Sequence, residues 1–124
     1  MGLESRVSFP GFVPAGQMAA LLAGATGVVF PSLYEGFGLP LVEAMAAGVP
    51  VACSSTTALP EVAGDAALLF DPRVPAQIAD AMAALVNDGA LRERLVEAGR
   101  RRAPEFADAD RMAREYWELL CGGP

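Results

Sequence analysis

Short apolar runs alternate with amphipathic segments along this chain, and this alternation predicts its helices and strands. The run Gly27–Pro31 contains no polar residue, which is typical of a parallel strand buried on both faces. The predicted strands are Val7–Val13, Gly27–Pro31, Val49–Cys53 and Ala66–Phe70. The predicted helices are Gln17–Ala23, Leu39–Ala47, the single turn Pro60–Ala63, Pro75–Val86, Ala90–Arg102 and Ala109–Leu120. This order predicts an α/β fold: a Rossmann-like parallel sheet of about four strands with flanking helices.

The spacing of apolar residues predicts which helix faces are buried. The residues expected on these faces are Met18, Leu21, Leu22, Ile78, Met82, Leu85, Val86, Leu91, Leu95, Ala98, Met112, Tyr116 and Leu119. We expect most aromatic residues to pack in or beside the core rather than to stack on a nucleobase. These residues are Phe9, Phe12, Phe30, Tyr34, Phe70 and Trp117.

Composition excludes several classes of protein. The chain has 124 residues, 53% of them hydrophobic, which favours one folded domain over disorder. A formal net charge of -6 argues against a partner that is a nucleic acid polymer. There is no histidine, and Cys53 and Cys121 lie far apart, so neither a metal site nor a disulfide scaffold is expected. No apolar run suits a membrane span or a signal peptide, so we expect a cytoplasmic location and leave peripheral membrane contact open.

Two carboxylates carry the candidate chemistry. Glu35 follows the predicted strand Gly27–Pro31, and Glu43 lies eight positions later in a helix made otherwise of apolar residues. A glutamate is rarely buried without a partner, and no cation is near Glu43 in the sequence. Glu43 therefore either faces solvent or lies in a cleft with hydrogen-bond donors. We favour the cleft, because this helix has almost no polar face.

The turn between the two glutamates suits an anion. Gly36 and Gly38 allow the backbone to approach a ligand closely, and the helix that follows begins with unpaired amides, where its dipole favours negative charge. Carboxylates on either side are good acceptors for vicinal hydroxyl groups. A nucleoside diphosphate sugar has this combination of an anionic centre and flanking hydroxyls.

At these residues the chain resembles the retaining glycosyltransferases of family 4, which have the GT-B fold. The resemblance rests on Glu35-x(7)-Glu43 within the extended segment Phe30–Val51. Val7–Val13, Leu59–Val62 and Ala66–Pro72 also resemble family segments. The resemblance implies a chain that forms the C-terminal, nucleotide-sugar-binding segment over residues 1–124, as a partial domain.

The resemblance also implies a role for individual residues. Glu35 would contact hydroxyls of the donor sugar and act at the catalytic centre. Gly36, Phe37 and Gly38 would line the sugar and phosphate pocket, and Leu39 and Pro40 would lie where the helix amides meet the diphosphate. Glu43 would accept hydrogen bonds from the ribose, and Val13 would present main-chain groups to the nucleobase. No metal and no cofactor is needed, since the nucleotide sugar is itself the substrate.

The chain departs from the family in ways that leave alternatives open. It contains no lysine, although a lysine and an arginine clamp the diphosphate in the family. Two preceding strands and the N-terminal acceptor domain have no counterpart here, so we expect no turnover by the isolated chain and an exposed sheet edge that favours a homodimer. The chain is then part of an enzyme, a binding module without turnover, or a fragment that complements a separate N-terminal domain.

Other polar residues have simpler interpretations. The segment Ser54–Ala58 contains four hydroxyl groups that could contact a phosphate, but we favour a solvated polar loop. The cluster of late arginines is interpreted as a solvated helix face, and Glu97 and Arg101 as a surface pair four residues apart.

Overall fold

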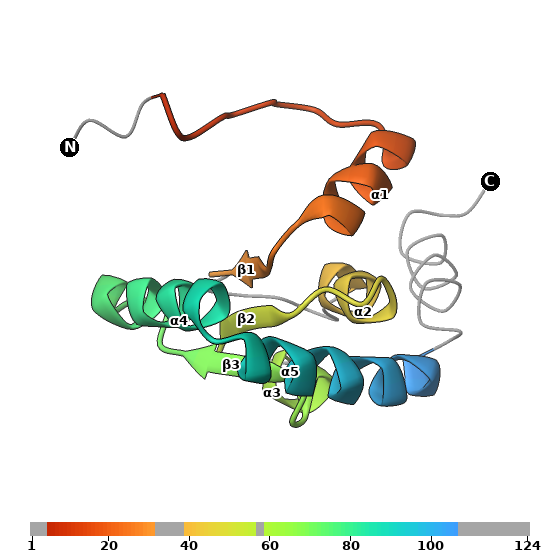
Figure 1. The fold of residues 1–124 in the computed structure, drawn as a ribbon, viewed down its shortest axis with the longest axis vertical. Helices are drawn as coiled ribbons and strands as arrows, with labels where there is room; N and C mark the ends of the chain where they lie inside the picture. The colour runs from red at the N-terminus through yellow and green to blue at the C-terminus, as the bar shows by residue number, and fades with distance from the viewer. Residues whose placement is uncertain (1–4, 32–38, 57–58, 107–124) are drawn as a thin grey trace, which may run out of the picture.

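The computed structural model describes residues 5–31, 39–56 and 59–106 (Figure 1). The predicted helix Ala109–Leu120 and the candidate residues Glu35, Gly36, Phe37 and Gly38 lie outside the described residues. The described elements are α1 (Ala15–Gly24), β1 (Val28–Phe30), α2 (Leu39–Ala46), β2 (Val51–Ser54), α3 (Leu59–Ala63), β3 (Ala67–Phe70), α4 (Pro75–Asn87), α5 (Gly89–Arg102) and the 3-10 turn η1 (Ala103–Phe106).

The described strands form one parallel sheet in the order β1-β2-β3. In this register Val28 pairs with Val51, and Val51 pairs in turn with Ala67. All residues of the central strand β2 are buried, whereas β1 is half-buried. The α/β class and the parallel sheet are therefore confirmed, but the described residues contain three strands rather than four. Among them β1 is a half-buried edge strand, whereas burial on both faces is expected for Gly27–Pro31.

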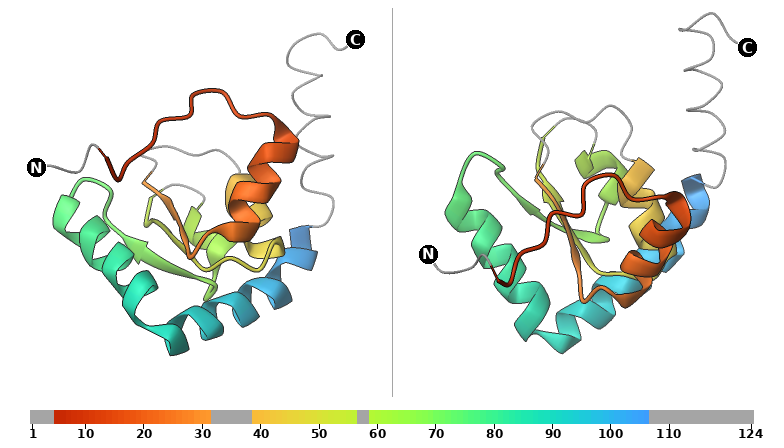
Figure 2. Two further views of the ribbon diagram at one scale, coloured as in Figure 1. Left: turned by 45° about the horizontal axis from the view of Figure 1, so that its top comes forward. Right: turned by 90° about the horizontal axis from the view of Figure 1, so that it is seen from above.

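Helices cover both faces of the sheet (Figure 2). On one face α2 and α3 pack against Val51 and Cys53 of β2, and on the other α4 packs against Ala52 and the half-buried Leu68. Helix α5 contributes to both clusters, with Leu95 on the α4 side and Ala98 on the α2 side. This helix therefore joins the two layers.

Glycine residues set the end of α2 and its distance from α5. Gly48 has a φ of 75°, and its amide donates to the Met45 carbonyl at 3.1 Å, while the Val49 amide donates to the Ala44 carbonyl at 3.1 Å. This pair of hydrogen bonds is the Schellman motif, which satisfies carbonyls at the end of the helix. A Cβ on Gly99 would lie 3.4 Å from the Met45 side chain, so a glycine there permits the close approach of α5 to α2.

Two of the late arginines cap helices, which corrects their interpretation as a solvated face. Arg92 donates to the carbonyls of Leu85 and Val86 at the end of α4, at 2.9 and 2.8 Å. Arg102 donates to the carbonyls of Glu61 and Val62 in α3. Both guanidinium groups complement the negative end of a helix dipole. Arg102 lies far from its acceptors in the sequence, and Arg92 of α5 reaches back to the end of α4. Helix periodicity therefore predicts neither contact.

The surface pair predicted between Glu97 and Arg101 is confirmed. The Arg101 Nη1 atom lies 3.0 Å from Glu97 Oε1, and both side chains are largely exposed. A pair of this kind contributes little to stability, because water and salt screen the two charges.

The prediction of a strand at Val7–Val13 is wrong. No described residue of this segment is in a strand, and the side chains of Phe9 and Phe12 are 90% and 92% exposed. Pro10 has no N–H to donate, and Gly11 has a φ of 70°, so the backbone departs from extended geometry at its centre. The expectation that Phe9 and Phe12 pack in or beside the core is also wrong. Without a strand at Val7–Val13, no sheet pairing holds these side chains against the core of the described residues.

Two predicted helix faces are also partly wrong. Met82 and Val86 are exposed on α4, where Ala81 and Leu85 form the buried face instead. On α1, Met18 and Leu21 are exposed, and Leu22 packs against the core. The buried face Leu91, Leu95 and Ala98 of α5 is confirmed. Alanine-rich helices leave several faces equally apolar, so periodicity alone does not choose between them.

The described residues also set limits on membrane and metal interpretations. Within residues 5–31, 39–56 and 59–106, no helix has the length and apolar character for crossing a membrane. The same ranges contain no cluster of three acidic, cysteine or histidine side chains arranged to bind a metal ion.

We predict that Arg102→Met destabilises the fold. The substitution keeps an apolar stem but removes the donors to the two α3 carbonyls, so the free energy of unfolding should fall by about 1–3 kcal/mol. Urea denaturation followed by circular dichroism measures the loss. The matched control is Arg101→Met, on the same helix and paired only at the surface, which should change stability by less than about 0.5 kcal/mol. Equal effects of the two substitutions would contradict the capping role.

We also expect the 124-residue chain to self-associate. Strand β1 pairs with β2 alone among the described strands, and the exposed apolar segment around Phe9 is available to cover its outer edge in a second copy. Sedimentation velocity over a range of concentrations should detect dimers or larger species, and Phe9→Ser should reduce them. Met82→Ser, at an exposed apolar residue of α4, is the control. A parent chain that stays monomeric throughout would count against this expectation.

Candidate functional site

The carboxyl ends of the three strands meet at one edge of the sheet and are joined by hydrogen bonds. The Ser54 hydroxyl donates to the Phe30 carbonyl at 3.1 Å, and the Ser55 amide donates to the Phe70 carbonyl at 2.8 Å. Ligands of open α/β sheets bind at this edge. The prediction that Ser54 begins a solvated loop is wrong, since it is the last residue of β2 and is fully buried.

The turn after β3 lies at the same edge, and hydrogen bonds within the turn occupy its polar side chains. Asp71 Oδ1 accepts hydrogen bonds from the amide and the Nε atom of Arg73, both at 3.0 Å. The Gln77 side chain accepts from the Asp71 amide at 2.8 Å. The hydrogen bond from the Arg73 side chain holds the pKa of Asp71 below its usual value. This carboxylate is therefore committed to the turn and is a poor candidate for ligand binding.

Helix α2 brings an amino terminus and one carboxylate to the site. Leu39 and Pro40 form its first turn, and Pro40 removes one of the amides that point out of this end. Leu41, Val42, Ala44 and Met45 are buried, whereas Pro40, Glu43 and Ala46 of α2 and the following Ala47 are exposed. The ion pairs among the described residues involve Asp71, Glu97 and Glu105, so Glu43 has no cation beside it there.

A pocket of about 640 Å³ lies between this face of α2 and helix α1. Its described lining residues are Phe12, Val13, Met18, Ala19, Leu22, Glu43 and Ala47. Among them Glu43 is the only charged residue, and the others present apolar side chains. Glu43 is exposed, which is the first of its two alternatives, and it also lines a pocket. The hydrogen-bond donors that the second alternative requires are not among the described lining residues, whose other side chains are apolar. The ribbon views place α1 beside α2, as the shared lining requires (Figure 2).

The structure brings together two site residues that lie thirty positions apart in sequence. Val13 and Glu43 line the same pocket, and Leu39 and Pro40 begin the helix that carries Glu43. Sequence reasoning missed Phe12 as a lining residue, because a phenylalanine in a predicted strand is expected to be buried. The Pro10-Gly11 break immediately before it was the available signal.

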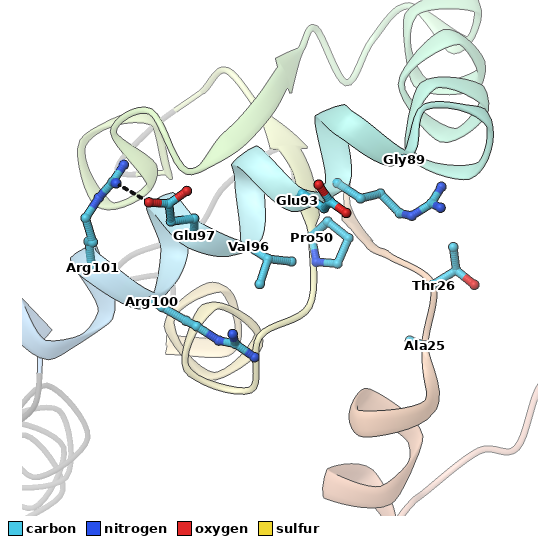
Figure 3. A pocket seen from close by; sticks show the side chains of 10 residues that line it. Ala25, Thr26, Pro50, Gly89, Glu93, Val96, Glu97, Arg100 and Arg101 are labelled. Atoms are coloured by element: carbon cyan, nitrogen blue, oxygen red, sulfur yellow. Dashed lines mark hydrogen bonds and ion pairs between the residues drawn. The ribbon is translucent and has the colours of Figure 1, made fainter.

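A second pocket, of about 700 Å³, lies at the opposite edge of the sheet (Figure 3). Ala25, Thr26 and Pro50 line it just before β1 and β2 begin, and α5 supplies the charged side chains. Several of its charged side chains already have partners. Arg101 forms an ion pair with Glu97, and Arg92 donates to a carbonyl at the end of α4. This pocket is slightly larger than the first, but it lies at the amino ends of the strands, whereas ligands of open α/β sheets bind at the carboxyl ends. Its side chains also carry charges of both signs. It is therefore the weaker candidate for a ligand site.

Cys53 is not a candidate nucleophile. Its side chain is fully buried in β2, as predicted, and burial raises its pKa to about 11. The thiolate is the reactive form of cysteine, so this thiol is inert at neutral pH.

Comparison with known proteins gives a consistent result. Residues 1–102 match the family described as glycosyl transferases group 1. The chain is 42% identical over 104 residues to the O-antigen chain mannosyltransferase B of Escherichia coli, covering 84% of this chain and 27% of that protein. It is 45% identical over 92 residues to the MMP alpha-(1->4)-mannosyltransferase of Mycolicibacterium hassiacum, covering 72% and 22%. The chain thus spans about a quarter of the length of these relatives.

Solved structures agree with the sequence relatives. The sucrose-phosphate synthase of Thermosynechococcus elongatus superposes with a TM-score of 0.78 at 31% identity, over 98% of this chain and 32% of that one. The C-terminal domain of a glycosyl transferase group 1 family protein from Francisella tularensis superposes with a TM-score of 0.74 at 32% identity, over 84% and 55%. Both neighbours are GT-B glycosyltransferases, and the second is a C-terminal domain.

Proposed function

Because the chain belongs to the glycosyl transferases of group 1, we propose that residues 1–124 are the C-terminal segment that holds the sugar donor, a nucleoside diphosphate sugar. The observation that carries this proposal is the shared pocket of Val13 and Glu43. A single carboxylate among apolar residues repels a phosphate and favours the uncharged part of a nucleotide. The vicinal hydroxyls of a ribose suit the carboxylate, and a nucleobase suits the apolar wall.

The diphosphate would lie one helical turn away from the ribose. The amides of α2 that have no acceptor within the helix begin at Leu39, four residues before Glu43, which is about 6 Å along the helix axis. Amides at a helix start attract phosphate through their unpaired N–H groups and the helix dipole. This spacing suits a nucleotide that runs along α2, with its diphosphate at Leu39 and Pro40 and its base against Val13.

The catalytic part of the proposal rests on residues outside the described ranges. We assign Glu35 to the donor sugar and to the catalytic centre, and Gly36, Phe37 and Gly38 to the sugar and phosphate pocket. The resemblance to family 4 supports a retaining, metal-independent transfer of a hexose. The acceptor would be bound by an N-terminal domain, as the length of the relatives supports, and peripheral membrane contact would belong to such a longer protein.

We predict that Glu43→Gln weakens the binding of nucleoside diphosphates. The neutral amide keeps the size of the side chain but loses the charge-assisted hydrogen bonds to the ribose, so Kd should rise about tenfold. Isothermal titration calorimetry with UDP, GDP and ADP measures this change. Glu61→Gln is the matched control, since it removes the same charge from an exposed residue of α3.

A second ligand series identifies the group that Glu43 contacts. The parent chain should bind a 2′-deoxynucleoside diphosphate more weakly than the ribonucleotide, and Glu43→Gln should abolish most of that difference. Inorganic pyrophosphate should bind both chains alike. If Glu43→Gln leaves the affinities for UDP, GDP and ADP unchanged, or if it weakens pyrophosphate equally, Glu43 does not bind the ribose.

A further inference from the structure

The described residues contain an exposed aromatic ring at the candidate nucleoside pocket. Phe12 lines this pocket together with Val13 and Glu43, yet its side chain is 92% exposed, so little of the ring packs against the rest of the described chain. A single exposed apolar residue needs no explanation by itself. Phe9 is such a residue, because it is 90% exposed and is not among the lining residues. What distinguishes Phe12 is its place at a pocket beside a carboxylate, with its ring open to a ligand.

Main-chain restraints on both sides hold Phe12 where its own packing does not. Gly11 before it has a φ of 70°, a conformation that favours glycine. Pro14, two residues later, has a φ of -58° and disfavours helical backbone at Val13. The Met18 amide donates to the Pro14 carbonyl at 2.9 Å, which joins this segment to the first turn of α1. The Phe12 ring is thus carried on a short, restrained backbone that leads directly into α1.

The rest of the pocket limits how a nucleobase is recognised. Apart from Glu43, every described lining side chain is apolar, so the others offer no strong hydrogen-bond partner to the polar edge of a base. Glu43 is assigned to the ribose. The described side chains therefore distinguish bases by contact area and stacking rather than by a hydrogen-bond pattern. Stacking area is larger for the two fused rings of a purine than for the single ring of a pyrimidine.

We propose that Phe12 is the nucleobase-stacking residue of the donor site, and that it makes purine nucleoside diphosphates bind more tightly than pyrimidine ones. This inference rests on the proposed donor-binding function, which it narrows to donors with a two-ring base. The Phe12 ring covers one face of the base in the offset arrangement that aromatic rings favour, while Glu43 binds the ribose. Stacking also removes the exposed face of Phe12 from water.

Calorimetry with three nucleotides tests this role. GDP, ADP and UDP are titrated into the parent chain, Phe12→Leu and Phe9→Leu at one protein concentration. The parent should bind GDP or ADP, whichever is tighter, more strongly than UDP. Phe12→Leu keeps an apolar side chain but has no ring, so the Kd of that purine nucleotide should rise about fivefold to tenfold and the Kd of UDP about twofold. Phe9→Leu, the matched control in the same segment, should leave all three Kd values unchanged.

A spectroscopic signal reports the stacking itself. A base proton above an aromatic ring shifts upfield, so the H8 proton of the bound purine nucleotide should shift upfield with the parent chain and with Phe12→Tyr, which keeps the ring. The shift should be absent with Phe12→Leu. Because Phe12 is exposed, Phe12→Leu should keep the unfolding midpoint of the parent. Inorganic pyrophosphate, which has no base, should bind all four chains alike.

The outcomes distinguish this inference from the function on which it rests. A parent chain that binds none of the three nucleotides overturns the donor-binding function and this inference with it. A parent that binds them, with no loss of affinity in Phe12→Leu, overturns the stacking role and leaves the donor-binding function intact. An equal loss in Phe9→Leu, an equal loss of UDP and purine affinity in Phe12→Leu, or a parent that binds UDP as tightly as the purines also overturns this inference.

Discussion

Strand β2 is covered on both faces, and the arrangement of the other described elements follows from that burial. Val51 and Cys53 project to the side of α2 and α3, while Ala52 projects to the side of α4. A strand with no polar face needs a layer on each side, because each apolar face left in water would cost free energy in proportion to its area. Parallel strands also require crossover connections, and α2 and α3 provide them. Helix α5 then closes the amino edge, held close to α2 by the absence of a side chain at Gly99.

The sequence predicts those parts of the fold whose signal is local. The run Val49–Cys53 depends only on neighbouring residues, and the structure confirms a strand there, over Val51–Ser54. Val7–Val13 also has an apolar pattern, although Pro10 and Gly11 interrupt it. A strand exists only where another strand pairs with it, and no described strand pairs with this segment. Arg92 and Arg102 present the opposite case, since their partners are main-chain carbonyls that no pattern of side chains reveals.

The candidate site divides in the same way. That Glu43 lies in a helix with buried neighbours follows from its apolar surroundings in the sequence. That Val13 lies across a pocket from it does not, because the contact depends on how α1 packs beside α2. The motif from Glu35 to Gly38 carried most of the functional prediction, but the structure leaves those residues undescribed. The geometric support therefore comes from the nucleoside half of the site, and the motif supports the sugar half.

The two halves also differ in the physics that would hold a ligand. Glu43 is exposed, so its charge stays hydrated and requires no buried partner. Ser54 is fully buried, so its hydrogen bond to the Phe30 carbonyl is shielded from bulk water. Sugar transfer requires that the sugar lie within fractions of an ångström of its target, whereas the nucleoside only has to keep the donor bound.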